Sequence, residues 1–169
     1  CRLNRDGFLD APAPEWSPLL EAANDAHALS GGLFDPTIQP LWHAYAQHFQ
    51  ALPDATTGPS ESTLAKARSH SGWSHLQYST DSIRFERPDM QLTLNGIAQG
   101  FITDRISVIL QQAGYQHVLV ELGETRALGS HPEQRPWTIG IQNADNTAAF
   151  HDVAELDDCA LATSGSYGS

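Results

Sequence analysis

The segment LTLNGIAQGFITDRISVILQQAG, residues 92–114, constrains the fold more than any other part of the sequence. It begins with alternating apolar and polar residues, which is typical of a half-buried strand, and then changes to helical spacing until Gly114. We expect a strand that passes into an amphipathic helix from Gly96 to Gln112. The apolar stripe of this helix is predicted to comprise Ile97, Phe101, Ile102, Ile106, Ile109 and Leu110.

The remaining periodicity places helices before this junction and strands mostly after it. Helices are expected in PAPEWSPLLEAANDAHALSGG, from about Pro40, and in ESTLAKARSHSG. Strands are expected in HLQYS, SIRFER and QLTLN, and later in HVLVEL, TRALG, WTIGIQ, AFHDVAEL and CALATSG. This order predicts an α+β fold with a largely antiparallel sheet packed by helices, in one domain over residues 1–169. The stripe of Trp42, Tyr45 and Phe49 is predicted to lie in the core.

Composition excludes several classes of partner. The chain has 169 residues, of which 40% are apolar and 17% charged, as expected for a globular protein. Its formal charge of −11 repels nucleic acid and anionic lipid, so no nucleic-acid partner is expected. No window reaches the length of a membrane span. Cys1 and Cys159 lie at opposite ends without metal-like spacing and are interpreted as unrelated thiols.

The start of the predicted helix offers a place for an anion. Backbone N–H groups in the first turn of a helix have no intrahelical acceptor, and the helix dipole favours negative charge there. Gly96 and Gly100, with Asn95 as the expected N-cap, make residues 95–100 a plausible pyrophosphate cradle. The alternative is structural: Gly96 would be a turn residue, and Gly100 would permit close helix-to-sheet packing. The spacing matches neither the Walker pattern nor the dinucleotide fingerprint.

Two other kinds of chemistry find little support in the sequence. The pairs His43 and His48, and His70 and His75, are five residues apart, which does not place them on one helix face. No H-E-x-x-H or C-x-x-C motif accompanies them. The string ATSGSYG lacks the G-x-S-x-G elbow of a serine hydrolase.

Several separated strings together resemble one family, in matching order and spacing. SGGLFDPTIQPLW, LTLNGIAQGFITDR, VLVELGETRALG and ALATSGSYGS are similar to the TGGxFDPTxxPL, LDLGGIAKGYAVD, ALVNLGGDIRxxG and xxATSGDYE elements of ApbE-type FAD:protein FMN transferases. The opening CRLNRDG also resembles their SRLNxxG. The agreement extends from Arg2 to Tyr167.

The resemblance implies an activity. Members of the family bind FAD with a divalent metal, usually Mg²⁺, and transfer FMN through a phosphoester bond to a Ser or Thr of a partner protein, releasing AMP. Some members mainly hydrolyse FAD. By resemblance, the backbone carbonyl of Ala98 is the candidate metal ligand. A noncatalytic FAD-binding protein, or an assembly factor that keeps only the fold, is the alternative.

The resemblance also implies the residues of the cofactor site. Asn4 lies at the asparagine of SRLN, and Asp35 and Thr37 at the DPT element that shapes the flavin pocket; turn and capping roles are the alternatives. Asp104 matches the Asp that follows KGYAV in the family pattern, and it either orients the loop and caps neighbouring N–H groups or is a solvated carboxylate. The complete implied set is Asn4, Asp35, Thr37, Asn95, Gly96, Ile97, Ala98, Gln99, Gly100, Asp104, Thr163, Ser164, Gly165 and Tyr167.

The sequence departs from the family at informative positions. Gln99 replaces a lysine that could meet phosphate, and Glu124 replaces the second glycine of LGGD. These changes bear on affinity and on the balance between transfer and hydrolysis. LTLNGIAQG and LGExRALG resemble the branch linked to nitrous-oxide reductase maturation, which implies a periplasmic location and a membrane flavoprotein as acceptor. The same resemblance is compatible with a full-length protein that associates with the membrane.

Segments that the family carries are not found in the 169 residues. These are an N-terminal strand before SRLN, and a histidine-bearing segment with a DAxxT metal-binding motif after SGDY. The expected catalytic histidine would therefore follow Ser169. We expect the sequence to be a fragment of a longer protein, with a fold that is incomplete at both ends, and a degenerate protein is the alternative.

Overall fold

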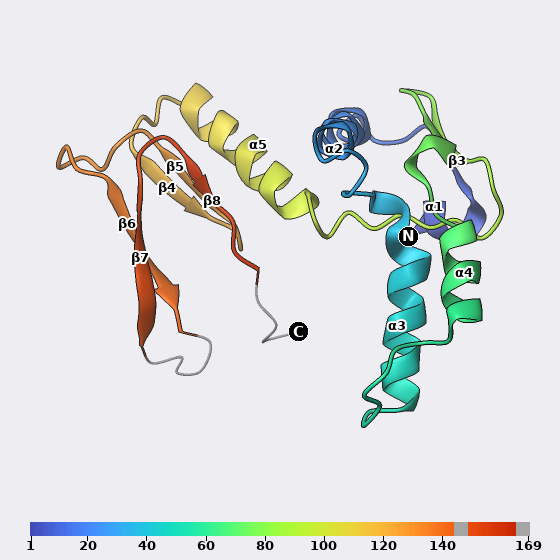
Figure 1. Cartoon of the computed structure of the whole chain (residues 1–169). Helices are drawn as coiled ribbons and strands as arrows, with labels where there is room; N and C mark the ends of the chain where they lie inside the picture. Colours follow the sequence, from blue (N-terminus) through green and yellow to red (C-terminus); the bar gives the residue numbers. More distant parts are fainter. Residues whose placement is uncertain (144–148, 165–169) are drawn as a thin grey trace. The chain divides into compact units, whose positions relative to one another are not determined.

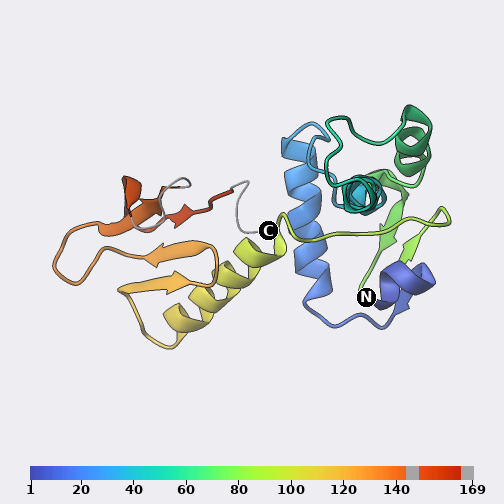
Figure 2. The ribbon, with the colours of Figure 1, turned by 90° about the horizontal axis from the view of Figure 1, so that it is seen from below.

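The computed structural model describes residues 1–143 and 149–164 and groups the chain into two compact units, Cys1–Gly96 and Ile97–Ser169 (Figures 1 and 2). The prediction of a single domain over 1–169 stays a prediction. Among the described residues, no helix combines the length and apolar character needed to cross a membrane.

The sheet of the first unit brings together segments far apart in the sequence. β3 (Ser82–Phe85) lies in the centre, with β1 (Phe8–Asp10) and β2 (Leu76–Tyr78) antiparallel on its two sides. Leu9 and Tyr78 both stand opposite Ile83, which is fully buried. The expected strands in HLQYS and SIRFER are confirmed. β1 and the preceding α1 (Arg2–Asp6) were not predicted, because neither is long enough to display a period.

The helices of the first unit begin and end at the signals in the sequence. α2 (Trp16–Leu29) stops before two glycines with positive φ, Gly31 and Gly32. The 3₁₀ helix η1 (Pro36–Ile38) leads directly into α3 (Gln39–Ala51), and α4 (Glu61–Ser69) packs beside α3 (Figure 1). Ser60 caps α4 by accepting a hydrogen bond from the Thr63 N–H at 3.3 Å. A second 3₁₀ helix, η2 (Trp73–His75), precedes β2.

Two predictions for the first unit are wrong. QLTLN is not a strand, because its backbone bonds to the Asn4 side chain and to the Pro36 carbonyl of η1 instead of a neighbouring strand. The stripe on α3 is not in the core: Trp42 is 59% exposed, and Tyr45 and Phe49 are each 41% exposed. α3 packs against α4 and η1, so this face of the helix is left uncovered within the unit.

The second unit consists of one helix and two small antiparallel sheets. α5 (Ala98–Gln112) packs against β4 (Val118–Glu121) and β5 (Thr125–Leu128), and β5 also pairs with β8 (Ala160–Leu161) (Figure 1). β6 (Trp137–Gln142) and β7 (Phe150–Leu156) form a separate two-stranded ribbon. The strands expected after the helix are thus confirmed, although the one in CALATSG contains two residues only.

The helix of the second unit starts later than expected and buries a different face. It begins at Ala98, not at Gly96. Its buried residues are Thr103 and Ser107, whereas Ile102 and Ile109 of the predicted stripe are exposed. Both hydroxyls donate to the carbonyl four residues earlier, Thr103 to Gln99 at 3.0 Å and Ser107 to Thr103 at 2.8 Å. Their polar atoms are satisfied within the helix, so these side chains can face the sheet without a desolvation penalty.

The strand pairings of the named strands are all antiparallel among the residues that the structure describes, and helices pack on the sheets. The predicted α+β class with largely antiparallel sheets is confirmed.

Candidate functional site

Asp35 and Thr37 form a buried hydrogen-bond network in the first unit. Asp35 Oδ1 accepts from the Thr37 backbone N–H at 2.8 Å and from the Thr37 hydroxyl at 2.6 Å. Thr37 Oγ1 in turn accepts from the Gly72 N–H at 2.7 Å, and Asp35 Oδ2 accepts from the Trp73 N–H at 3.1 Å. Thr37 is completely buried. These two residues therefore act by fixing η1 against the loop before η2, and the Thr37 side chain is not available to a ligand.

Asn4 pairs with the backbone of Leu92 in the manner of a strand. Its Nδ2 donates to the Leu92 carbonyl and its Oδ1 accepts from the Leu92 N–H, both at 2.8 Å. The next residue, Thr93, donates its N–H to the Pro36 carbonyl at 2.8 Å. The predicted flavin-site residues Asn4 and Asp35 thus help to hold one extended segment, which leads to the glycines of the predicted cradle.

Asn4 and Asn95 line the same cavity in the first unit. This cavity has a volume of about 480 Å³, within the range of small-molecule sites. Its lining mixes polar and apolar side chains and comes from the start of α1, from α2 and α3, and from the extended segment. The lining residues are Cys1, Asn4, Trp16, Gln39, His43, Gln91, Leu92, Thr93, Leu94 and Asn95. Two of the predicted cofactor residues are therefore brought together here, although they are 91 positions apart.

The predicted cradle straddles the boundary between the two units, so its halves belong to different units. Asn95 as the N-cap was wrong: Ile97 is the N-cap, with φ −141°, and no side chain caps the helix. Asn95 instead lies in the turn before it, where its N–H approaches Thr93 Oγ1 at 3.4 Å. The first-turn N–H groups of α5 thus have no side-chain acceptor in the described residues, which suits an anion.

The two glycines of the cradle have different environments. A Cβ at Gly96 would lie 3.2 Å from Phe34 Cε2, so this glycine is a turn residue that packs closely on a ring. Among the described residues, a Cβ at Gly100 would meet no atom within 4 Å apart from the backbone of its own helix. The packing interpretation of Gly100 is therefore wrong in this structure, and the missing side chain leaves open space beside the first turn of α5.

Gln99 attaches the start of α5 to the β4–β5 turn. Its Nε2 donates to the Leu122 carbonyl at 3.0 Å and crosses Gly123, where a Cβ would overlap the Gln99 amide. Gly123 has φ +95°, a conformation that favours glycine. Gln99 thus occupies the space above this turn in place of the family's lysine. Sequence reasoning had no signal for the contact, because the two residues are 24 positions apart.

Gly123 also lines a cavity of about 660 Å³ in the second unit, together with Thr163 and Ser164. The cavity is lined by residues of β4, β5, β6, β7 and β8. The other lining residues are Glu121, Thr125, Ile139, Gly140, Ile141, Gln142, Asn143, His151 and Leu161. The helix start, the LGE turn and the ATS loop, three of the strings that resemble the family, therefore meet within one unit.

The remaining predicted residues do not join the two cavities described above. Asp104 is exposed and caps no backbone group; it lines a cavity of about 270 Å³ together with Arg126 and Asp158. Gly165 and Tyr167 lie outside the described residues. Sequence reasoning missed the burial of the Glu124 carboxylate, whose Oε2 is buried without a hydrogen-bond partner in the described part of the chain. The one sequence signal for this buried carboxylate was that Glu124 replaces a glycine of the family pattern.

A metal site is not complete in the described residues. They contain no group of three or more His, Cys, Asp or Glu side chains arranged to hold an ion. Ala98 is the first residue of α5, so helix geometry directs its carbonyl along the helix axis toward the following turn. Magnesium prefers six oxygen ligands, and one carbonyl of this kind does not supply them.

The fold is similar to that of solved flavin transferase structures. The structure of the flavinyl transferase ApbE from Pseudomonas stutzeri, in its apo form, matches with a TM-score of 0.74 and 30% identity, over 95% of this chain and 49% of that one. The ApbE protein of Thermotoga maritima matches with a TM-score of 0.78 and 25% identity, over 98% of this chain and 54% of that one.

The sequence comparisons give the same assignment. An FAD:protein FMN transferase of Chlamydia pneumoniae is 28% identical over 155 residues, covering 90% of this chain and 46% of the relative. The Vibrio cholerae enzyme of that name is 29% identical over 143 residues, covering 83% and 42%. The profile of the ApbE family matches residues 1–169, and the chain belongs to the ApbE family. It spans about half the length of these curated relatives.

Proposed function

We propose that the protein carrying this sequence is an FAD:protein FMN transferase. It would bind FAD and join the FMN phosphorus to the hydroxyl oxygen of a Ser or Thr in an acceptor protein. The bond between the two FAD phosphates breaks, AMP leaves with the bridging oxygen, and the hydroxyl proton passes to a base. The family resemblance implies a histidine as that base, and the residues described above would bind and orient the substrate.

The open first turn of α5 is the observation that carries this proposal. Its N–H groups have no side-chain cap, and a Cβ at Gly100 would contact none of the residues that the structure describes outside its own helix backbone. An FAD pyrophosphate can approach such a turn closely and be stabilised by the helix dipole. This feature supports FAD binding in a chain whose net charge of −11 would otherwise repel an anion.

In this proposal, the ligands of Mg²⁺ come mainly from the phosphates of FAD and from parts of the protein other than the described residues. The described residues offer one candidate ligand, the Ala98 carbonyl, and do not form a site by themselves. Mg²⁺ commonly keeps several waters and binds to substrate phosphates. When bound, it would neutralise charge on the phosphates of FAD. No role of Asn4, Gln99 or the other residues described above depends on it.

One observation favours a second function, hydrolysis of FAD to FMN and AMP, or FAD binding without catalysis. Gln99 replaces the family's lysine, and its side-chain amide donates a hydrogen bond to the Leu122 carbonyl. The position thus presents no cation to a phosphate. A weaker hold on the transferred group would let water compete with the acceptor hydroxyl.

The test uses the full-length protein with FAD, Mg²⁺ and a domain of the acceptor that carries a Ser or Thr site. Intact-mass analysis should show one added FMN on the acceptor, and none after chelation of the metal or after Ser/Thr→Ala at the site. Release of FMN and AMP without labelling would establish the pyrophosphatase. Binding of FAD without turnover would establish the noncatalytic alternative.

The proposal also includes the acceptor protein and the cellular location of the enzyme. The resemblance of LTLNGIAQG and LGExRALG to one branch supports a periplasmic enzyme that flavinylates a membrane flavoprotein of nitrous-oxide reduction. Cell fractionation and the flavin content of that acceptor in a deletion strain test it. Unchanged flavin on the acceptor in the deletion strain would reject this partner.

A further inference from the structure

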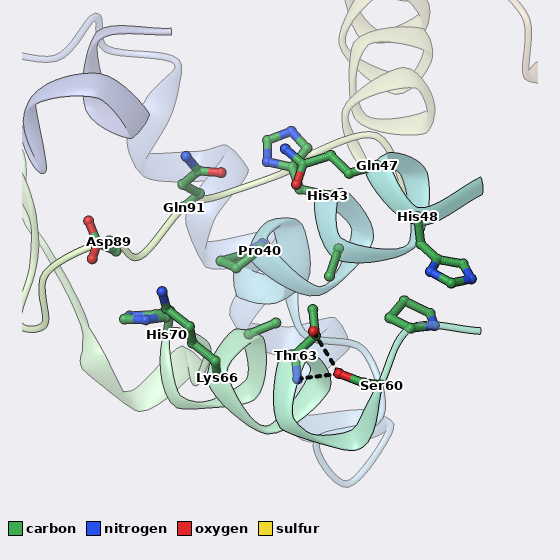
Figure 3. A pocket seen from close by; sticks show the side chains of 13 residues that line it. Pro40, His43, Gln47, His48, Ser60, Thr63, Lys66, His70, Asp89 and Gln91 are labelled. Carbon is green, nitrogen blue, oxygen red and sulfur yellow. Dashed lines mark hydrogen bonds between the residues drawn. The ribbon is translucent and has the colours of Figure 1, made fainter. Parts of the chain in front are cut away.

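A larger cavity lies between α3 and α4 in the first unit (Figure 3). Its volume is about 760 Å³, a size typical of small-molecule sites. The segment 89–91 lines one side of it. His43 and Gln91 also line the cavity of Asn4, so the two cavities adjoin. Its lining contains none of the residues assigned to flavin.

Lys66 supplies a positive charge without a partner. It is the single lysine of the sequence, and its ammonium makes no ion pair or hydrogen bond with the residues that the structure describes. Arg68, two positions along the same helix, does have a partner: its Nη1 bonds to Glu61 at 2.6 Å. Lys66 extends instead toward the side of the pocket where Asp89 and Gln91 lie (Figure 3). The pocket therefore offers an anion a cation that is not paired with any carboxylate in the described part of the chain.

The pocket also offers hydrogen-bond acceptors. Gln91 Oε1 is buried without a hydrogen-bond partner in the described part of the chain, which is uncommon in folded proteins and calls for a donor. The carboxylate of Asp89 has no ion-pair or hydrogen-bond partner among the described residues. His70 Nδ1 is 3.1 Å from the Pro88 carbonyl, so it carries the hydrogen and Nε2 of a neutral ring is an acceptor.

We propose that this pocket binds a small zwitterion of the amino-acid type. The carboxylate of the ligand pairs with Lys66. Its ammonium, which has three N–H donors, faces Gln91 Oε1, Asp89 and the ring of His70, and its apolar body lies on the lining residues Pro40, Ala44 and Ala67. A simple anion would leave the acceptors unsatisfied and meet the charge of Asp89. This site is additional to flavin transfer and does not depend on it.

The charge pattern can be tested with a matched set of ligands. The probes are L-leucine and L-phenylalanine, each also as its N-acetyl derivative, which lacks the ammonium, and as its amide, which lacks the carboxylate. Binding to the full-length protein is measured by calorimetry and by NMR shifts without FAD. We expect at least one parent amino acid to bind, and both of its derivatives to bind roughly tenfold more weakly, because each loses a charge-assisted contact. Equal binding of a parent and its derivatives, or no binding by any probe, overturns the proposal.

Variants locate the site. Lys66→Gln should weaken binding of the parent amino acid roughly tenfold, whereas Arg68→Gln removes the same charge from the same helix and should leave it unchanged. Gln91→Met should weaken ligand binding without lowering the melting temperature, because Oε1 has no partner in the protein. Equal effects of the Lys66 and Arg68 variants would mean that only net charge matters and would reject the site. The readout is direct binding, so failure here is distinct from failure of flavin transfer.

Discussion

Gln99 lies directly across Gly123 and ties the first turn of α5 to the β4–β5 turn. The bond from Gln99 Nε2 to the Leu122 carbonyl is 3.0 Å long, and there is no room for a side chain at residue 123. The residue that distinguishes this chain from the family's lysine pattern is thus part of the local structure beside the predicted phosphate cradle.

A double-mutant cycle measures this contact. Gly123→Ala should destabilise the protein by roughly 1–3 kcal/mol, because it displaces the Gln99 amide and places a Cβ at φ +95°. Gln99→Ala should reduce that cost by about 0.5 kcal/mol or more, since only the backbone strain remains. Denaturant unfolding of the four proteins gives the coupling. Strictly additive effects would mean that the two residues do not touch.

Gly100→Ala separates stability from FAD binding. A Cβ at this position meets open space, and replacing a helical glycine by alanine should stabilise the helix by up to about 1 kcal/mol. The same methyl group should obstruct a pyrophosphate at the first turn and weaken FAD binding at least about tenfold, as a lost close contact would. Flavin fluorescence titration and thermal unfolding check the two effects. Gln111→Ala, near the other end of α5, serves as the control, and unaltered FAD affinity in the Gly100 variant would reject the cradle.

A substitution at Gly96 would not separate the effect on stability from the effect on FAD binding. Its Cβ would lie against the Phe34 ring at 3.2 Å, so a valine there changes packing and binding together.

Thr37→Val tests whether the DPT element acts through structure. The valine keeps the shape of the side chain but removes the hydroxyl, which leaves the Gly72 N–H and Asp35 Oδ1 each short of one bond. We expect a loss of about 1–3 kcal/mol in unfolding free energy, the cost of an unsatisfied buried polar group. The exposed Thr80→Val is the matched control and should change stability by no more than about 0.5 kcal/mol. Similar stability of both variants would show that the buried network contributes little.

Glu86 should contribute to acid sensitivity. Its hydrogen bond with His75, at 3.1 Å, and then that from Gln77, at 2.6 Å, hold the pKa of the Glu86 carboxyl below its ordinary value. A carboxylate with a lowered folded-state pKa stabilises the protein above its unfolded-state pKa, and this contribution disappears as pH falls through the folded-state pKa. The difference in stability between the wild type and Glu86→Gln should therefore shrink as pH falls from about 6 to about 3. Urea melts at several pH values measure it, and a constant difference would contradict the assignment.

The sequence by itself determined the elements with clear local signals. The glycines after Leu29 end α2, and Ser60 caps α4, because these residues act on backbone groups within a few positions. Ordered motifs from Arg2 to Tyr167 were enough to predict the family. The α+β class followed from the change of hydrophobic period along the chain.

Only the tertiary structure decided which residues meet. The Asn4 amide takes the place of a neighbouring strand for Leu92, 88 positions away, and this is why the alternating run of QLTLN does not form a ladder. The buried face of α5 is the polar pair Thr103 and Ser107, because their hydroxyls are satisfied inside the helix. Periodicity records hydrophobicity along one segment, whereas burial and hydrogen bonding depend on which distant segment packs against it.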